Sequence, residues 1–531
     1  MSEVFVYTER RGRSKQVQKN LNSVSKPVLF VLGVALSGLA PQAQALELDW
    51  SGQFRGEYHL VTPYTLDGSQ GSPDAARAAA GGYYIGGSGK TDADFETLFL
   101  RLRPKVIVND NVSIKSEFWV GDPIFGFFGA GSSFFNDQRQ LYSTQSRGSV
   151  ITAQRVWGEF QTDLGTVQIG RLPLQWGLGI VWNDGEDVWS RYMSTGDAIR
   201  FSTKFGAFSF IPSFIKYSMG NTVGGSCTVA GGTCTAGQGS GDVTDYSLIL
   251  KYDNPDEEFE GGLNFIRRIA SSGQDANYGF FGVGTGGGAQ GGSSLNYNTF
   301  DIYLKRRFGK FTVGVEVPLV GGTIGGISYK SYGVAVEAGW KPSDSWESHL
   351  KIGQAPGQPN SSTAIPDTFK AFFYNPNYKL GLIMFNYQLA NFGRANSQNN
   401  ATLEPKNAYS IYDNPVVNAQ YIAFTQAYKT EKWNFHGSFI MATAAETAQA
   451  SGNFFNTWDR AFHAYGAGAA QSNFLGWEVD AGVGMKWDEA THFGLDMGLY
   501  FPGNFMKFSN TATENQTKSV FAMVVKAGVN F

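Results

Sequence analysis

The chain has few cysteines, no long apolar run after its first 40 residues and no excess of positive charge. Its only cysteines among 531 residues are Cys227 and Cys234, in a Gly- and Thr-rich stretch that offers too few ligands for a metal site. After residue 40, no apolar run approaches the roughly 20 residues that a membrane-spanning helix needs. A cysteine-ligated metal protein and a helical membrane protein are therefore excluded.

The first 45 residues predict a secretory signal peptide. Six basic residues lie between positions 10 and 26, an apolar run follows from 28 to 40, and small residues at 43 and 45 suit cleavage. The mature chain, 46–531, has 36 Lys and Arg against 43 Asp and Glu, a net charge of −7, which disfavours nucleic acid as a partner. After export to an oxidising compartment, the two cysteines are expected to form a small loop disulfide.

Apolar and polar residues alternate with a period of two through the mature chain. Between residues 46 and 60, Leu48, Trp50 and Phe54 have one parity, and charged residues such as Arg55 and Glu57 have the other. Such strands recur throughout the chain, and aromatic residues, 15% of the total, gather near strand ends. The pattern predicts an all-β protein, with residues 46–531 forming one transmembrane antiparallel β-barrel that has lipid outside and water inside.

Short and long connections alternate between the expected strands. Short turns are expected at 109–111, 163–165, 206–207, 308–310, 342–344, 430–432 and 488–490, with longer loops between them. Outer-membrane barrels have this asymmetry, with short periplasmic turns and long extracellular loops. We expect about 20 strands, two of them weak and lying between residues 368 and 389; an even number is required, and 18 would also be acceptable.

Two segments resemble those of bacterial outer-membrane proteins. The final Phe531, after an alternating strand, is similar to the terminal signal that the barrel-assembly machinery reads. The sequence DLGTVQIGR at 163–171 resembles the turn-and-strand signature of general bacterial porins. In those porins the next loop folds into the lumen and narrows it, so the resemblance implies the same for loop 176–197, which joins the fifth and sixth expected strands. The architecture more loosely resembles alginate-export barrels and uncharacterised barrels of deltaproteobacteria.

Alternation also assigns charged side chains to the lumen. The first half of the wall is expected to contribute a basic arc, made of Arg101, Arg103, Lys105, Lys115, Arg155, Arg200 and Lys204. The second half is expected to contribute an acidic arc, made of Asp301, Glu316, Glu337, Glu478, Asp480 and Asp496. Opposed arcs would produce a transverse electric field across the pore. Alternatively the charges pair with one another, because Glu57, Glu117 and Glu159 lie within the basic arc.

Loop 176–197 carries four acidic residues, Asp184, Glu186, Asp187 and Asp197. We expect them at a constriction that faces the basic arc; the alternative is a solvated extracellular loop. Clustered carboxylates suit calcium, but the spacing of the first three matches no established calcium loop, so we expect no metal and no cofactor.

Another loop, 125–135, is rich in phenylalanine and unusually apolar for an outer surface. Contact between the subunits of a homo-oligomer such as a trimer would account for it. So would contact with lipopolysaccharide, or folding back under neighbouring loops.

These features predict a porin in the outer membrane of a Gram-negative bacterium, a channel for passive diffusion of small hydrophilic solutes and ions. Its expected partners are outer-membrane lipid, lipopolysaccharide and, during biogenesis, the barrel-assembly machinery. The alternative is a substrate-specific channel for a sugar or an anionic polymer, with Arg101, Arg103, Lys105, Trp119 and Trp157 as a ladder. Enzymatic activity is not expected, because the five histidines do not converge in the strand pattern.

Overall fold

A computed structural model of the protein describes most of the chain after residue 46. The described residues are 47–64, 66, 91–121, 151–218, 243–270, 274–275, 279–280, 295–324, 327–363, 366–387, 389, 412, 414–450, 452–457, 461–465, 470–508, 514 and 516–531. The predicted signal peptide, the Cys227–Cys234 disulfide and the apolar loop 125–135 lie outside these residues.

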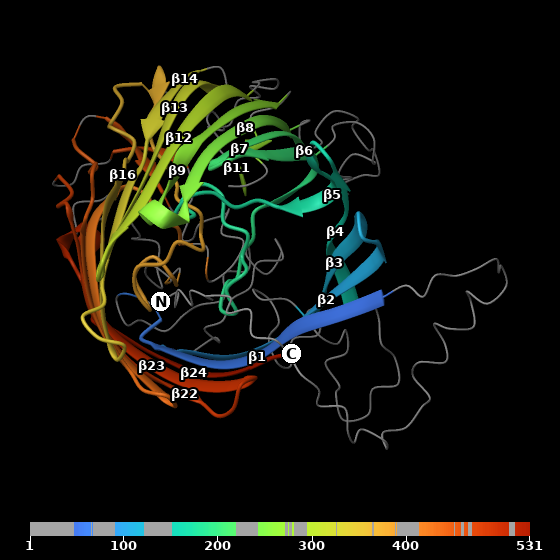
Figure 1. The fold of residues 1–531 in the computed structure, drawn as a ribbon. Helices are drawn as coiled ribbons and strands as arrows, with labels where there is room; N and C mark the ends of the chain where they lie inside the picture. Colours follow the sequence, from blue (N-terminus) through green and yellow to red (C-terminus); the bar gives the residue numbers. More distant parts are fainter. Residues whose placement is uncertain are drawn as a thin grey trace, which may run out of the picture.

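Eighteen of the described strands form one closed antiparallel wall (Figure 1). Each strand pairs with the wall strands before and after it, and β24 returns to pair with β1, from Gln53–Asn530 to Thr62–Phe521. The wall strands are β1 (Glu47–Thr62), β2 (Ala93–Asn109), β3 (Val112–Gly121), β4 (Ile151–Thr162), β5 (Gly165–Pro173), β6 (Thr195–Phe205), β7 (Phe208–Ser218), β8 (Val243–Asn254), β9 (Phe259–Ala270), β12 (Leu295–Phe308), β13 (Phe311–Ile324), β15 (Val334–Trp340), β16 (Trp346–Ala355), β18 (Ala419–Lys429), β19 (Trp433–Thr443), β22 (Phe474–Lys486), β23 (Thr491–Pro502) and β24 (Val520–Asn530).

The remaining elements are short. β14 (Ile327–Tyr332) continues the pairing along β13 and runs parallel to the two-residue β17 (Thr368–Phe369). Two small hairpins stand apart from the wall: β10 (Gln274–Asp275) with β11 (Gly279–Phe280), and β20 (Asn453–Asn456) with β21 (Ala461–Ala464). The 3₁₀ turns η1 (Pro255–Glu257) and η2 (Asn504–Lys507) follow β8 and β23. Among the described residues, no helix has the length and apolarity to cross a membrane.

Alternation along the wall strands separates an apolar outer face from a polar inner face. In β1, Leu48 and Trp50 are 50% and 53% exposed, whereas Arg55, Glu57 and His59 on the other parity are 5% exposed or less. Because successive side chains point to opposite faces of a sheet, this parity gives the direction of the wall side chains away from register shifts such as that between Glu117 and Phe118. The exterior is therefore mainly apolar, and the charged side chains of β1 named above point inward.

Exposed aromatic side chains flank the short turns and form a belt around one end of the barrel. Phe205 and Phe208 bracket one turn, Phe308 and Phe311 the next, and Trp340 and Trp346 another. Neighbouring members stack along the belt, with the rings of Phe311 and Trp340 5.9 Å apart. Amphipathic and aromatic side chains gather in this way where a barrel wall meets the polar boundary of a membrane.

The predicted turns connect wall strands at this same end, as does one that sequence reasoning missed, η1 between β8 and β9. Gly206 and Gly309 occupy the turns with φ of +59° and +60°, the left-handed backbone that glycine adopts without steric cost. The wall has 18 strands, the lower of the two counts that the sequence allowed. The two weak strands between 368 and 389 are not in the wall, because nearly every side chain there is buried and no outer face alternates with an inner one.

Candidate functional site: two segments inside the barrel

The connection between β5 and β6 runs across the interior of the barrel. We call residues 174–194 the first luminal segment (Figure 1). On one side of the wall, Arg55 in β1 donates to the carbonyl oxygens of Val188 and, at 2.9 Å, Ser190. On the other side, Glu316 in β13 accepts hydrogen bonds from the N–H groups of Leu178 and Ile180. Since β1 and β13 lie on different parts of the wall, the segment crosses the lumen.

The wall binds this segment through charge-assisted hydrogen bonds to its main chain. Arg101 donates to the carbonyl oxygen of Gly185 at 3.0 Å, and Arg155 donates to that of Asp184. Just before the segment, Arg200 donates to the carbonyl oxygen of Pro173, the last residue of β5, at 3.1 Å. Hydrogen bonds to ionised groups are roughly twice as strong as those between neutral groups. The inward-facing arginines therefore hold carbonyl groups on one side, while Glu316 holds amide groups on the other.

A second luminal segment, residues 366–387, is bound by the same kind of contact. Glu478 in β22 accepts from the N–H groups of Ile383 and Met384 at 2.8 and 2.6 Å, and Asp480 accepts from that of Leu382 at 3.2 Å. At its other end, the hydroxyl of Tyr374 donates to the carbonyl oxygens of Val334 and Gln354 at 2.6 and 3.0 Å. This segment therefore connects β15 and β16 with β22 through the interior.

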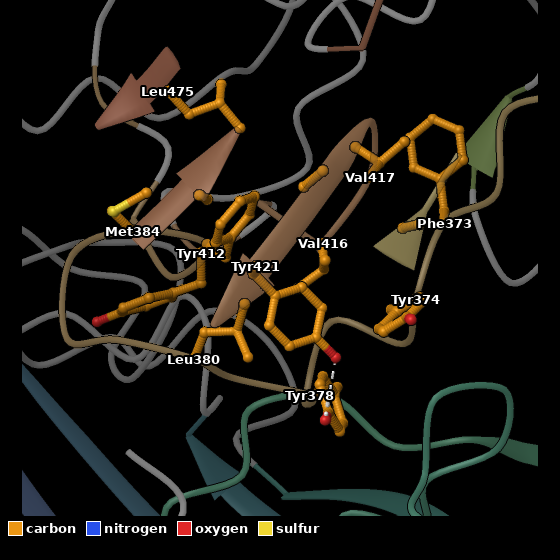
Figure 2. Packing of buried hydrophobic residues seen from close by; sticks show 14 of the residues in the cluster. Phe373, Tyr374, Tyr378, Leu380, Met384, Tyr412, Val416, Val417, Tyr421 and Leu475 are labelled. Carbon is orange, nitrogen blue, oxygen red and sulfur yellow. Dashed lines mark hydrogen bonds between the residues drawn. The ribbon is translucent and has the colours of Figure 1, made fainter. Parts of the chain in front are cut away.

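Apolar side chains pack the second luminal segment against the inner wall (Figure 2). Tyr374, Tyr378 and Leu380 lie beside Tyr421 of β18, and the hydroxyl of Tyr421 donates to that of Tyr378 at 3.2 Å. Each is 4% exposed or less. Burying a large apolar side chain stabilises a fold by about 1.5–3 kcal/mol, so this cluster forms an apolar core inside a barrel whose wall faces inward with charges.

The two luminal segments hold each other through asparagine side chains. Oδ1 of Asn377 accepts from the N–H groups of Arg191 and Tyr192 at 3.3 and 3.0 Å. The N–H of Asn375 donates to the carbonyl oxygen of Ile180 at 2.7 Å, and its side-chain amide donates to Ser194 at 3.0 Å. The segments therefore form one unit and share their contacts with the wall.

Arg191 connects both luminal segments to β1. Its guanidinium lies 2.8 Å from Glu57 and 3.9 Å from the ring centroid of Tyr412, and His59 hydrogen-bonds to the hydroxyl of Tyr387 at 2.7 Å. Burial lowers the pKa of Arg191, but the attraction of Glu57 outweighs it and raises the pKa above its ordinary value. Arg191 is therefore a permanent cation at the junction of the two segments.

In the predicted basic arc, Arg101 and Arg155 are buried, and Arg103, Lys105, Lys115 and Arg200 are half-buried. Glu117 lies 3.6, 3.1 and 3.4 Å from Arg101, Arg103 and Arg155, so pairing within the arc, the alternative reading, holds for these three. Lys115 pairs with Glu159 at 2.8 Å. Lys105 is half-buried beside Lys115 in the β2–β3 pair, and Lys204 is exposed next to the turn at 206–207.

The predicted acidic arc is also mostly covered. Asp301, Glu316 and Glu478 are 0% exposed, and Asp480 is 3% exposed. Glu337 pairs with Lys351 at 3.0 Å, and Asp496 lies 3.2 Å from His436 and 2.5 Å from Lys526. The hypothesis of two arcs with a field between them stays a prediction. Several of its charges contact main-chain groups inside the barrel or oppositely charged side chains, which reduces the charge that is open to water.

The four loop acids have different environments. Glu186, 45% exposed, lies 2.6 Å from Arg103 and 2.9 Å from Arg155. Burial, and then the neighbouring charge of Glu186, raise the pKa of Asp184. Asp187 accepts from the N–H of Trp189 at 2.7 Å. These three lie in the first luminal segment, and the described residues contain no group of three or more His, Cys, Asp and Glu side chains placed to hold a metal.

Asp197 does not belong to a constriction. It lies in β6 and pairs with Arg171 of β5 at 2.6 Å, and both side chains are about half-exposed. They share the parity of Ile169 and Ile199, which are 47% and 55% exposed, so the pair is on the outer face. The loop range in the prediction extended past the start of the strand at Thr195.

The side chains that join the two luminal segments were not identified as a site in the sequence. Arg191, Asn375 and Asn377 lie outside any alternating pattern, and Glu57 was noted only as a neutralising charge. A usable signal was present: the aromatic stretch FYNPNY at 373–378 is too rich in Asn and Pro for a wall strand. Trp119, expected in a solute ladder, is 7% exposed and donates to Glu117 at 2.6 Å.

No protein-family model and no curated protein sequence matches this chain. Several solved structures are similar to it at low identity. OccK2 (OpdF) of Pseudomonas aeruginosa is 8% identical with a TM-score of 0.47, covering 91% of this chain and 98% of that one. OpdK of Pseudomonas aeruginosa, solved with vanillate, is 10% identical with a TM-score of 0.44 and coverage of 91% and 98%.

OmpT of Vibrio cholerae, described as expressed in the outer membrane, is 10% identical with a TM-score of 0.34, covering 92% of this chain and 99% of that one. At these identities and TM-scores, no solute and no residue role carries over from these proteins to this chain.

The charged side chains that keep some exposure predict where ion selectivity is set. Arg103 and Lys115 are 24% and 34% exposed, so reversing both to Glu should shift the channel toward cations, because a mobile ion meets these charges directly. The measurement is the reversal potential under a salt gradient. Arg171→Glu, the same change on the outer face, is the matched control and should leave the reversal potential unchanged. If the reversal potential shifted equally in both variants, Arg103 and Lys115 would not lie on the path of the ions.

Proposed function

We propose that the protein is a channel in the outer membrane of a Gram-negative bacterium, through which small hydrophilic solutes and ions diffuse. A barrel that crosses a bilayer needs an apolar exterior, aromatic side chains at the membrane boundary and a closed ring of hydrogen-bonded strands. This barrel has an apolar exterior, an aromatic belt at one end and a closed wall. Most wall strands have at least the nine or so residues that suffice to cross the hydrocarbon with the usual tilt. With the short turns on the periplasmic side, as in other outer-membrane barrels, the start of β1 and the end of β24 lie on that side as well.

One observation carries the channel proposal: the first luminal segment extends from Arg55, Arg101 and Arg155 on one side to Glu316 on the other. A segment fixed at both sides of a polar lumen narrows the solute path and exposes Glu186 to it. The segment would thus set the size limit, and Glu186 with Arg103 and Lys115 would set the charge preference.

A substrate-specific channel is the second candidate, and the second luminal segment favours it. Two segments that bind each other, rather than one, reduce the free cross-section and build a fixed interior surface. A general diffusion pore gains nothing from a second packed segment, whereas a selective one needs a shaped path. Phosphorylated and neutral sugars and short anionic polymers are the solutes to compare.

The deciding experiment is single-channel recording of the folded mature protein in a planar bilayer under a salt gradient. Ohmic steps with a measurable reversal potential would support a channel, and a block by one solute class at low concentration would support the substrate-specific form. Silent bilayers from correctly folded, heat-modifiable protein would contradict both forms.

Phe531 carries a separate prediction on biogenesis. Its N–H and carbonyl groups exchange hydrogen bonds with Gly52 at 3.0 and 2.7 Å, and its ring is 57% exposed. Deleting Phe531 should lower the amount of assembled barrel in the outer membrane while secretion continues, because the terminal aromatic is presented to the assembly machinery. Heat-modifiability on gels measures assembly. Phe531→Tyr, which keeps an aromatic ring, is the control, and normal assembly of the deletion would refute the terminal-signal hypothesis.

A further inference from the structure

Two buried carboxylates beside the first luminal segment have no donor for three of their four oxygens. Asp301 in β12 and Glu316 in β13 are 0% exposed. No donor reaches either oxygen of Asp301 or Oε1 of Glu316, and only Oε2 of Glu316 accepts from the segment. The two carboxyl groups lie within hydrogen-bonding reach of each other. Two buried carboxyl groups in contact are stabilised either by a proton that they share or by a cation between them.

A third buried polar side chain completes this cluster. Asn264 of β9 lies directly opposite Asp301 in the β9–β12 pair, so both side chains share the inner face. Asn264 is 0% exposed, its Oδ1 accepts from Ser247 at 3.0 Å, and its Nδ2 has no partner. The two ends of an amide are interchangeable in placement. If the amide group of Asn264 is rotated by 180°, Nδ2 donates to the hydroxyl of Ser247. Oδ1 then occupies the position where Nδ2 had no partner.

We propose that Asp301, Glu316 and Asn264 bind one calcium ion. Hard divalent cations prefer carboxylate and amide oxygens, and two carboxylates neutralise the charge of one such ion. The cluster offers neither sulfur nor imidazole, which transition metals favour. The third protein ligand is the side-chain amide oxygen of Asn264. Water completes the coordination shell.

The ion would also fix the part of the first luminal segment that binds Glu316. Oε2 of Glu316 accepts from Leu178 and Ile180, and the segment approaches so closely that a Cβ on Gly177 would lie 2.5 Å from this oxygen. An ion on the other side of the same carboxylate holds it in the orientation that receives these amides. The ion site does not depend on which solute the pore carries.

The other acidic pair on the wall has more donors. Glu478 and Asp480 are also in contact and buried, but three N–H groups of the second luminal segment donate to them, which leaves Oδ1 of Asp480 as the one oxygen of this pair without a donor. Each pair anchors a luminal segment, yet only the first has an unpartnered amide side chain beside it. Glu478→Gln is therefore a matched control for changes at Asp301 and Glu316.

The test is the calcium content of the full protein, extracted from membranes and dialysed against metal-free buffer, by plasma mass spectrometry. We expect one calcium per chain in the wild type and in Glu478→Gln, and loss of that calcium in the double variant Asp301→Asn, Glu316→Gln. Wild-type protein without calcium, or equal calcium in the double variant, would overturn the proposal and leave the two carboxyls sharing a proton.

Terbium luminescence gives a second readout that does not depend on the double variant folding. Tyr303 lies directly opposite Glu316 in the β12–β13 pair, and its ring is 6.0 Å from that of Trp176. Excitation of these rings should sensitise Tb³⁺ bound at the site in place of Ca²⁺. Asn264→Ala should weaken Tb³⁺ binding by at least about tenfold. Even mutation of a residue that only hydrogen-bonds to a metal ligand weakens metal binding by this much. Unchanged emission and affinity in this variant would overturn the assignment of Asn264.

Discussion

Deletion of residues 182–192 is expected to raise single-channel conductance severalfold. This stretch contains Arg191 and the carbonyl groups that Arg55 and Arg101 bind, so its removal takes out the part of the first luminal segment that lies against β1 and β2. Water and salt would then fill that volume, and conductance increases with the free cross-section. In the wider lumen, water would hydrate Arg55, Arg101 and Glu57. This hydration offsets the free energy lost with the hydrogen bonds to the deleted segment.

The deletion requires a control for general damage to the barrel. Substituting Asp344→Asn in the short turn between β15 and β16 changes a residue at the end of the wall and should leave conductance unchanged. Glu316→Gln tests the same idea without a deletion, since it weakens the acceptor for Leu178 and Ile180 and should produce noisier current at nearly normal mean conductance. Normal conductance in the deletion would contradict a constriction at residues 182–192 and would place the narrowest point at the second luminal segment.

Glu117→Ala is expected to destabilise the folded barrel by about 3–5 kcal/mol, the cost of removing one partner from a buried ionic cluster. Glu117 is 2% exposed and lies within 3.6 Å of Arg101, Arg103 and Arg155. Without it, two buried guanidinium groups remain close together, with Glu186 of the luminal segment as the nearest acid. The free energy of unfolding in urea, measured on the barrel folded in detergent or liposomes, gives the value.

Glu347→Ala is the matched control for this measurement. Glu347 also contacts two cations, Lys341 at 3.4 Å and Lys429 at 2.6 Å, but it lies near a turn and its partners are about 35–48% exposed. Exposed pairs of this kind contribute about 0–1 kcal/mol. Equal losses in the two variants would show that burial of the Glu117 cluster adds nothing to stability.

The sequence determined the barrel because its signal is local and repeated. Strand parity in residues such as Leu48, Trp50 and Arg55 depends only on the geometry of an extended chain, so alternation identified the inner and outer faces. The short turns followed from Gly, Asn and Asp, whose backbone preferences are also local. The one missed turn, at 255–257, contains Pro and two acidic residues and lies in a polar stretch.

The same reasoning identified which charges face inward but not what they bind. Arg101, Arg155 and Glu316 have the predicted direction, yet their partners are main-chain groups of a segment that lies far away in the sequence. Strand parity carries no information on a chain that leaves the wall. The sequence predicted an electric field across a water-filled lumen. In the structure, these side chains instead form hydrogen bonds with a segment that partly fills the lumen.

The sequence by itself determined an antiparallel barrel with an apolar exterior, a charged interior and a loop after the fifth strand. Only the tertiary structure decided that two segments meet inside the barrel through Arg191, Asn375 and Asn377. The physical reason is range. Alternation and turns arise from neighbouring residues, whereas a filled lumen depends on contacts between positions more than a hundred residues apart, which no local pattern encodes.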